Sequence, residues 1–412
     1  MDVKEEIIIV GAGIAGLATS LGLHRMGLSS IVLEASDKLR SSGFGFLTWT
    51  NAWKALDALG IGDTLRDQHI QLQRLIATST ATGLETGKRS FTTRGKHGDH
   101  EVRCVKRHLL LESLENELPR GTIRLNSKVV SIEEEAGGGR VKVLHLADGT
   151  TLKAKVLIGC DGVNSMVAKW LGLKRPSYSG RSAARGITEY PEGHGFKPEF
   201  LQYFGDGFRS GFLPCDDKNI YWFFTWSPSP QEEEVERDPM KMKQFVLSKL
   251  GKVPQQVSAV VERCDLSSLL SSHIVFRSPL NILFGNISKA NVCVAGDALH
   301  PMTPDLGQGA CSALEDGVVL ARCLGEALKT TIDGGGGGEQ EQERIEKGLK
   351  RFAEERRWRA FGLVGTAYAV GLLQQSDGPA MNFLRDKLLS GFMAGLLLSK
   401  ADFDCGRLGV GH

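Results

Sequence analysis

The segment IIIVGAGIAG, residues 7–16, joins a run of β-branched residues directly to a glycine-rich turn. Such a short apolar run is typical of a buried strand in a parallel sheet. Good helix formers follow the turn up to Met26, and a second apolar run, residues 30–33, ends on Glu34. The order of strand, glycine turn, helix and strand predicts a βαβ unit, and with it a Rossmann-like α/β domain.

The three glycines of this turn have the spacing that binds a dinucleotide. Gly11 permits the tight turn, Gly13 lets the backbone approach a pyrophosphate, and Gly16 lets helix and strand pack closely. The following helix offers free N–H groups to phosphates. Glu34, 18 positions beyond Gly16, can accept hydrogen bonds from a ribose. The alternative is a glycine-rich turn in an ordinary α/β domain.

Composition and charge argue against several classes of protein. The chain has 412 residues, 41% of them hydrophobic, which allows roughly two to three domain equivalents. Its 50 Lys and Arg against 48 Asp and Glu give a net charge of +2, so we expect no nucleic-acid partner. The eight cysteines include no C-x-x-C pair and no zinc spacing, which predicts free thiols, a reducing compartment and no metal site.

The protein is expected in the cytoplasm, with an organellar location after removal of a transit peptide left open. The first predicted strand begins at Glu6 or Ile7, which leaves no space ahead of it for a signal or transit peptide. The longest apolar run near the C-terminus, residues 392–398, is too short to span a bilayer. We therefore expect no integral membrane segment.

The other elements follow from periodicity and turn residues. Helices are expected at residues 50–59, from 105 onward, and at 310–329, 343–369 and 380–400. Strands are expected at residues 70–79, 86–93, 122–133, 140–146, 152–158 and 291–295. The glycine run at 334–338 is interpreted as a flexible linker without chemistry.

The character of the sequence changes between residues 178 and 279. Short β-like runs there carry many of the phenylalanines, which predicts a separate antiparallel sheet with an aromatic face. Residues 232–238 are expected to form a solvated acidic loop. Strand alternation places Trp222 and Phe224 on one face, which fits a pocket wall and fits core packing equally well.

Two later strands also end in glycine-containing turns. The strand at 152–158 leads into Asp161-Gly162, and the strand at 291–295 leads into Gly296-Asp297. A carboxylate at a strand end is suited to bind hydroxyl groups. The alternative role for such a carboxylate is to cap the next turn. The three turns together are much more specific than any one of them.

This combination of motifs resembles the class A flavoprotein monooxygenases, the single-component aromatic hydroxylases with the para-hydroxybenzoate hydroxylase fold. Within that family it looks most like the salicylate hydroxylase and zeaxanthin epoxidase-like branch, which includes plant monooxygenases. The resemblance covers residues 6–358 and is densest at the three turns. It implies a Rossmann-like FAD-binding domain (1–177 and 286–330), an interleaved antiparallel substrate sheet (178–285), and a linker with C-terminal helices (331–412).

The resemblance also implies which residues would contact FAD. The first glycine turn would hold the pyrophosphate and Glu34 the adenosine ribose, while Arg107 would reach the flavin side and Asp297 the ribityl chain. Asp161 and Gly162 match a motif that helps bind FAD and is linked to the nicotinamide cofactor. The expected cofactor contacts are Gly11, Gly13, Ile14, Ala15, Gly16, Glu34, Ala35, Arg40, Arg107, Asp161, Gly162, Gly296, Asp297, Pro304, Gly307, Gln308, Gly309 and Ala310.

The catalytic region is expected beside the flavin ring. By resemblance, Pro301, Gly307 and Gly309 lie next to the isoalloxazine, and Arg40 lies in a loop near flavin and nicotinamide. A helix that begins at Ala310 would place about half an elementary positive charge where reduced flavin is negative.

Three residues near this region carry open alternatives. His300 is as consistent with a buried structural hydrogen bond as with a role at the ring. A surface position is the default for Arg40. Cys311 stands where many members of the family have Asn, which weakens the transfer of aromatic-hydroxylase substrates to this chain.

The implied reaction is a monooxygenation. NADPH or NADH, bound transiently, would reduce FAD, and O2 would form a flavin C4a-hydroperoxide that hydroxylates or epoxidises a small aromatic or otherwise electron-rich molecule. Substrate contacts are expected from the aromatic sheet, at Tyr203, Phe212, Trp222 and Phe224. The alternatives are a flavin oxidase, a redox-neutral flavoenzyme such as a cyclase, and a non-catalytic binding module. The residues expected around the ring argue against the last, and the sequence does not define the oligomeric state.

Overall fold

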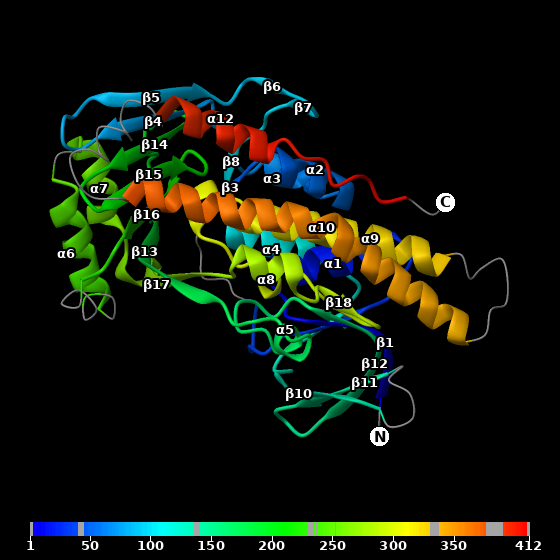
Figure 1. Cartoon of the computed structure of the whole chain (residues 1–412). Coiled ribbons are helices and arrows are strands. Elements are labelled where there is room, and N and C mark those ends of the chain that lie inside the picture. Colours follow the sequence, from blue (N-terminus) through cyan, green and yellow to red (C-terminus); the bar gives the residue numbers. More distant parts are fainter. Residues whose placement is uncertain are drawn as a thin grey trace.

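The computed structural model describes residues 3–39, 45–135, 141–229, 235, 238–251, 253–329, 338–375 and 390–409. The chain forms two main sheets, and the helices α9 (Gly309–Lys329) and α10 (Gly338–Gln375) run alongside each other in front of them in Figure 1. The expected α/β class, with a Rossmann-like sheet and a second sheet, is confirmed.

The first sheet has the strand order β10-β11-β12-β1-β2-β9, with β19 joining the end of β12. The central strands β1, β2, β9, β12 and β19 are parallel, while β10 and β11 form an antiparallel extension. Its strands are β1 (Val3–Val10), β2 (Ile31–Leu33), β9 (Ile123–Arg124), β10 (Val129–Glu134), β11 (Lys142–Leu146), β12 (Thr151–Gly159), β18 (Ser288–Lys289) and β19 (Val292–Val294).

Burial explains the apolar run that begins the chain. Ile8 and Ile9 are fully buried in β1, which has parallel neighbours on both sides. The helix α1 (Ile14–Arg25) follows the glycine turn and packs on α9 so closely that a Cβ atom on Gly22 would lie 2.6 Å from Ala321 Cβ. The predicted βαβ unit is confirmed.

The second sheet has the order β17-β13-β16-β15-β14-β4-β5. It is antiparallel except for the parallel pair β14 and β4. Its strands are β4 (Arg74–Ser79), β5 (Glu85–Ser90), β13 (Ser177–Glu189), β14 (Glu199–Phe204), β15 (Phe208–Pro214), β16 (Asn219–Trp226) and β17 (Leu269–Phe276). Thus β4 and β5 belong to this sheet although they lie within residues 1–177, the expected first part of the FAD-binding domain.

Two helices that the sequence analysis did not anticipate cover one face of the second sheet. They are α6 (Pro239–Lys249) and α7 (Gln255–Arg263). Asp238 caps α6, because its side chain accepts hydrogen bonds from the N–H groups of Met240 and Lys241. Apolar side chains from both helices and the sheet form a second core, separate from the large core of the first sheet.

The remaining elements connect or cover these layers. The expected helix at 50–59 is present as α2, and the one expected from residue 105 is α4. Residues 334–337, expected in the linker, lie outside the described residues. The connecting elements are β3 (Gly45–Thr48), α2 (Thr50–Leu59), α3 (Gly62–Arg66), β6 (Arg94–Gly95), β7 (Gly98–Asp99), β8 (Arg103–Lys106), α4 (Arg107–Asn116), α5 (Met166–Trp170), η3 (Leu266–Ser268), α8 (Pro279–Phe284), η4 (Gly296–Ala298), η5 (Pro304–Leu306) and α12 (Ser390–Ala401).

Candidate functional site

The three glycine-containing turns lie together at one edge of the first sheet. The Gly11 N–H donates to the Leu33 carbonyl (2.7 Å), and the Cys160 N–H donates to the Val10 carbonyl (2.8 Å). The Ala295 N–H donates to the Gly159 carbonyl (2.9 Å). Because these strands are parallel, their carboxyl ends meet at the same edge, where ligands bind in open α/β sheets.

The first turn is tight where it meets protein and open where a ligand would lie. A Cβ atom on Gly11 would lie 2.4 Å from the Cys160 carbonyl oxygen. A Cβ atom on Gly16 would lie 1.9 Å from the Gly11 carbonyl oxygen. A Cβ atom on Gly13 would meet no described atom within 4 Å. The space in front of Gly13, at the N-terminus of α1, therefore fits a pyrophosphate.

Glu34 ties the end of β2 to this turn. Its Oε2 atom accepts a hydrogen bond from the Ala12 N–H (2.9 Å), and its Oε1 atom accepts one from the Ser36 N–H (3.0 Å). A carboxylate oxygen has two lone pairs, so each retains acceptor capacity toward a ribose hydroxyl. Ala35 follows directly, at the same strand end.

Asp161 shapes the second turn. Its Oδ1 accepts a hydrogen bond from the Ser165 hydroxyl (2.5 Å), and its Oδ2 accepts one from the Met166 N–H (2.6 Å) at the start of α5. Burial raises the pKa of Asp161, against the opposing effect of these hydrogen bonds. Gly162 has a φ of +75° and open space beside it. The observed contacts of the Asp161 side chain are thus structural.

Asp297 combines solvent access with enclosure by protein. It is exposed, whereas its neighbours Gly296 and Ala298 are buried. The protein around the carboxyl group still raises its pKa by desolvation, and His300, Arg107 on α4 and Arg185 on β13 oppose that rise. Asp297 therefore lies where the first sheet, α4 and the second sheet come together, open to a ligand from outside.

The loop between Pro301 and α9 leaves room in front of a helix N-terminus. Gly307 has a φ of +62°, and a Cβ atom there would lie 3.1 Å from Trp49 Nε1. A Cβ atom on Gly309, the first residue of α9, would have Met302 Cγ at 4.0 Å as its sole near neighbour among the described atoms. The helix begins one residue before the expected Ala310. Its positive end faces open space, which suits an anionic or electron-rich ring.

A buried charge network holds the third turn in place. Asp316 on α9 accepts hydrogen bonds from the Gly296 N–H (2.7 Å), His300 Nε2 (2.7 Å) and Arg356 Nε (2.6 Å) of α10. Burial alone would raise the pKa of Asp316, but His300 and Arg356 lower it to about 2. The carboxylate thus fixes both ends of the turn that carries Asp297.

The neighbouring residue Glu315 extends this network to the glycine loop. Its carboxylate pairs with Arg356 (2.7 Å) and Arg359 (2.8 Å) and accepts from the Asn51 amide (2.5 Å). The same amide donates to Gln308 Oε1 (2.8 Å). Sequence analysis named Gln308 as a cofactor contact but missed Asn51, Glu315, Arg356 and Arg359. The available signal was two adjacent acids, Glu315 and Asp316, inside an otherwise apolar helix.

The four aromatic residues expected at the substrate lie in the second core. Trp222 and Phe224 share a face, as predicted, but that face packs against α6 and α7. All four expected side chains lie in this second core: Tyr203, Phe212, Trp222 and Phe224. Sequence analysis did not anticipate α6 and α7, and these helices determine which face is covered. This packing fits the core alternative stated above, and contact of these residues with substrate stays a prediction.

Phe224→Leu is expected to lower the free energy of unfolding by about 1–2 kcal/mol, because it leaves a small cavity in this core. Urea unfolding measures the loss. The KM for substrate should stay at the wild-type value, whereas Phe223→Leu, on the opposite face, should change it. A changed KM in Phe224→Leu with normal stability would show that the side chain reaches the substrate.

The opposite face of the second sheet points toward the candidate site. A Cβ atom on Gly45 of β3 would lie 2.7 Å from Tyr221 Cβ. Phe223 packs against the first core, and the Arg209 guanidinium lies 5.0 Å above its ring. Arg209 also pairs with Asp305 (3.1 Å) in the loop before Gly307. Sequence analysis missed this polar and aromatic face.

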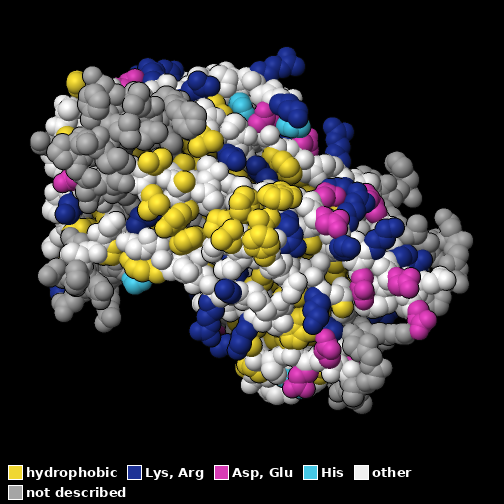
Figure 2. Space-filling view, in the orientation of Figure 1, with side chains coloured by type: hydrophobic (Ala, Val, Ile, Leu, Met, Phe, Trp, Pro, Cys, Tyr) yellow, Lys and Arg dark blue, Asp and Glu magenta, His cyan; other side chains and the backbone are white. Residues whose placement is uncertain are grey.

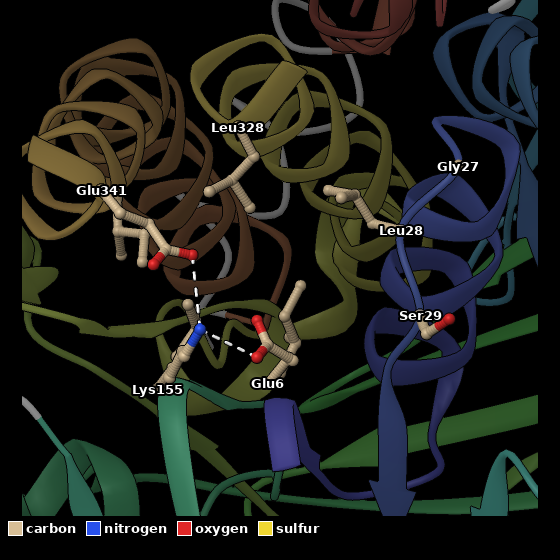
Figure 3. A pocket seen from close by; sticks show the side chains of 10 residues that line it. Glu6, Gly27, Leu28, Ser29, Lys155, Leu328 and Glu341 are labelled. Carbon is tan, nitrogen blue, oxygen red and sulfur yellow. Dashed lines mark hydrogen bonds and ion pairs between the residues drawn. The ribbon is translucent and has the colours of Figure 1, made fainter. Parts of the chain in front are cut away.

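Arg40, Pro304 and Arg107 were also expected at the cofactor. Arg40 falls outside the described residues, so its expected role stays a prediction. Pro304 begins η5, and Arg107 begins α4. A pocket of about 220 Å³ lies beside β1 and β12, where Lys155 contacts Glu6 (2.8 Å) and Glu341 (3.4 Å) (Figure 3). Its lining residues on β1 and β12 lie before the carboxyl ends of these strands, so this pocket is not the candidate site.

Comparisons with known proteins place this geometry in context. The chain matches the FAD binding domain family over residues 4–345. It is 52% identical to Monooxygenase 2 of Arabidopsis thaliana over 406 residues, 98% of each protein. It is 39% identical to Monooxygenase 1 of the same plant over 411 residues, 98% of this chain and 99% of the relative. The crystal structure of Klebsiella pneumoniae HpxO complexed with FAD and uric acid matches with a TM-score of 0.82 and 22% identity, over 99% of this chain and 98% of that one.

Proposed function

Because this chain belongs to the FAD binding domain family and is an FAD-dependent monooxygenase, we propose that it hydroxylates a small, flat, electron-rich aromatic or heteroaromatic compound. Electrons come from NADPH or NADH, and the second substrate is O2. When bound, FAD supplies the activation of O2 and the transfer of one oxygen atom. The protein contributes binding, orientation and a partly dry environment for this chemistry.

The cofactor is proposed to lie across the three turns. The N–H groups at the start of α1 bind the pyrophosphate beside Gly13, Glu34 accepts from the adenosine ribose, and Asp297 accepts from the ribityl hydroxyls. The N-terminus of α9 at Gly309 then stabilises negative charge on the ring. Pro301 and Gly307 lie at the two ends of the loop that borders the ring.

The substrate is proposed to bind between this loop and the second sheet. Burial raises the pKa of Tyr221 to about 12, despite the opposing charge of Arg185. Its phenol is protonated at neutral pH, as for any tyrosine, and can donate a hydrogen bond. Phe223 offers an apolar surface, and Arg185 offers positive charge. This combination suits a flat ring with oxygen acceptors or an acidic group. Uric acid, present in the related HpxO structure, has that chemistry.

One observation carries the proposal. Asp297 is exposed between buried neighbours, and His300, Arg107 on α4 and Arg185 on the second sheet oppose the desolvation that raises its pKa. An accessible carboxylate that lies near both sheets supports a cofactor and a substrate that meet there. The eight free, buried cysteines further support a reducing compartment, for which we propose the cytoplasm.

The test is anaerobic mixing of the FAD-loaded protein with NADPH and, separately, NADH, while the absorbance of oxidised flavin is followed. A panel of hydroxylated aromatics, N-heteroaromatics and neutral terpenoids is added in turn. We expect faster flavin reduction with one nucleotide in the presence of a flat aromatic acid or phenol. Flavin that neither nucleotide reduces, with any compound, would contradict the proposal.

Tyr221→Phe is expected to raise the KM for the substrate about three- to tenfold, because one hydrogen bond is lost. Its FAD affinity should be unchanged. Tyr203→Phe is the matched control, since Tyr203 is also buried but lies in the second core. Equal KM values for the two variants would exclude Tyr221 from the substrate site. Steady-state NAD(P)H oxidation with the identified substrate measures both.

A further inference from the structure

The helices α8 and α10 expose a continuous apolar surface, which Figure 2 shows as a yellow area on the front of the molecule. The most exposed side chains are Leu280 (60%) and Phe284 (79%) of α8, and Trp358 (64%) and Leu372 (47%) of α10. We call this surface, together with the partly buried Phe361, the α8–α10 face. Exposed apolar areas of this kind mark interaction sites.

The two helices lie side by side, so these residues form one surface. The Arg357 guanidinium of α10 donates to the carbonyls of Ile282 (2.7 Å) and Gly285 (2.8 Å) at the end of α8. At the other end of α8, Pro279 lies 3.7 Å from the Cβ position of Gly365. The helices are therefore antiparallel, and Phe284 and Leu280 run alongside the stretch that begins at Trp358.

The composition of α10 changes sharply at this face. Residues 338–359 are rich in charge, but residues 360–375 contain no Asp, Glu, Lys or Arg. A helix on the surface of a globular protein normally turns a polar face to water. The apolar half of α10 instead exposes Leu372. The exposed Trp358 lies just before this half and packs edge to face on Phe361, with ring centroids 5.7 Å apart.

Basic residues border the α8–α10 face. Lys174 and Arg175 are exposed, and their segment lies against α8, because Arg277 donates to the Lys174 carbonyl just before α8 begins. On the far side of α10, the Lys400 ammonium lies 3.7 Å from the Cβ position of Gly362. Figure 2 shows Lys and Arg side chains both above and below the apolar area, with the acidic ones gathered to its right.

We propose that the α8–α10 face docks on an anionic lipid bilayer. Tryptophan, phenylalanine and leucine side chains enter the interface between head groups and acyl chains, while the surrounding lysines and arginines contact lipid phosphates. Within the described part of the chain, no helix is both long and apolar enough to cross a membrane, so the contact is peripheral.

Charge favours a bilayer over a second copy of this chain. A symmetric dimer through this face would bring basic borders against basic borders, which repel, whereas anionic lipid attracts them.

The side of α10 that faces the protein interior contacts the candidate substrate site. Gln374 there accepts a hydrogen bond from Arg209 (2.5 Å), which also donates to Asp305. Docking would therefore place the candidate substrate site one helix away from the membrane.

The test is co-sedimentation of the FAD-loaded protein with vesicles of phosphatidylcholine alone or with about one third phosphatidylserine. We expect binding to the anionic vesicles that weakens as salt is raised. The double variant Phe284→Gln/Trp358→Gln should bind at least about tenfold more weakly. In Lys174→Glu/Arg175→Glu, the affinity for anionic vesicles should fall about fivefold for each basic residue replaced.

Control variants carry changes of the same kind elsewhere on the surface. Leu84→Gln replaces another exposed side chain (67%), and Lys88→Glu/Arg89→Glu reverses two exposed charges on β5. Both should bind vesicles like the wild type, and unchanged FAD absorbance verifies folding in every variant. Failure of the wild type to bind anionic vesicles would overturn the proposal. A wild-type dimer that Phe284→Gln/Trp358→Gln converts to monomer in sedimentation velocity would overturn it as well, because a second copy would then cover the face.

Discussion

Asp316→Ala is expected to lower the free energy of unfolding by about 3–5 kcal/mol. The carboxylate and the Arg356 guanidinium are both fully buried and lie 2.6 Å apart. Removing one partner leaves the Arg356 charge with Glu315 as its remaining buried carboxylate partner, and it deprives the Gly296 N–H and His300 of their shared acceptor. The turn that carries Asp297 should loosen, so FAD affinity should fall as well.

Urea unfolding of the wild type and the variant measures this loss. Glu326→Ala is the matched control on the same helix, since Glu326 pairs with Arg351 but both side chains are about half exposed. Its cost should be at most about 1 kcal/mol. Equal costs for the two variants would contradict the account of the buried network.

The stabilisation by Asp316 should depend on pH in acid. Its folded pKa of about 2 is lower than the ordinary value of about 3.9. A depressed carboxyl pKa contributes stability above the unfolded value, and that contribution is lost as the pH falls through the folded value. The difference between the wild type and Asp316→Ala should therefore be full above about pH 4 and shrink toward pH 2.

Gly16→Ala is expected to cost about 3 kcal/mol or more and to abolish measurable FAD binding. The new Cβ would lie 1.9 Å from the Gly11 carbonyl oxygen, which is backbone and cannot move without deforming the first turn. Thermal unfolding without FAD and a fluorescence titration with FAD measure the two effects.

Gly13→Ala separates folding from cofactor binding. Its Cβ would meet no described atom within 4 Å, so its stability should stay within about 1 kcal/mol of the wild type. The same methyl group would enter the space proposed for the pyrophosphate, and FAD affinity should fall. If Gly16→Ala were as stable as Gly13→Ala, the packing role of Gly16 would be wrong.

Sequence alone predicted the features that depend on neighbours along the chain. The order of apolar run, glycine turn and helix around residues 7–16 determines the βαβ unit locally, and Glu34 follows at a fixed distance. The helix α2 was predicted at its observed bounds, Thr50–Leu59, from the spacing of its apolar residues. These elements need only short-range periodicity and turn chemistry to be recognised.

Features that depend on distant contacts could not be predicted in this way. Alternation placed Trp222 and Phe224 on one face but gave no information on which helices would cover it, and α6 and α7 cover it. The strands β4 and β5 were expected, yet their place in the second sheet depends on the pairing of β4 with β14 far along the chain. The Asp316 network likewise joins residues on three separate elements.

The most direct test of the central claim, that the three turns form one FAD site at the junction of the two sheets, is an equilibrium titration of Asp297→Ala with FAD. Asp63→Ala is the control, because the side chain of Asp63 is 97% exposed and belongs to α3, which is not part of the three turns. Loss of a hydrogen bond to a charged group predicts FAD binding about tenfold weaker, or more, in Asp297→Ala, with wild-type affinity in the control. Wild-type affinity in Asp297→Ala would contradict the claim.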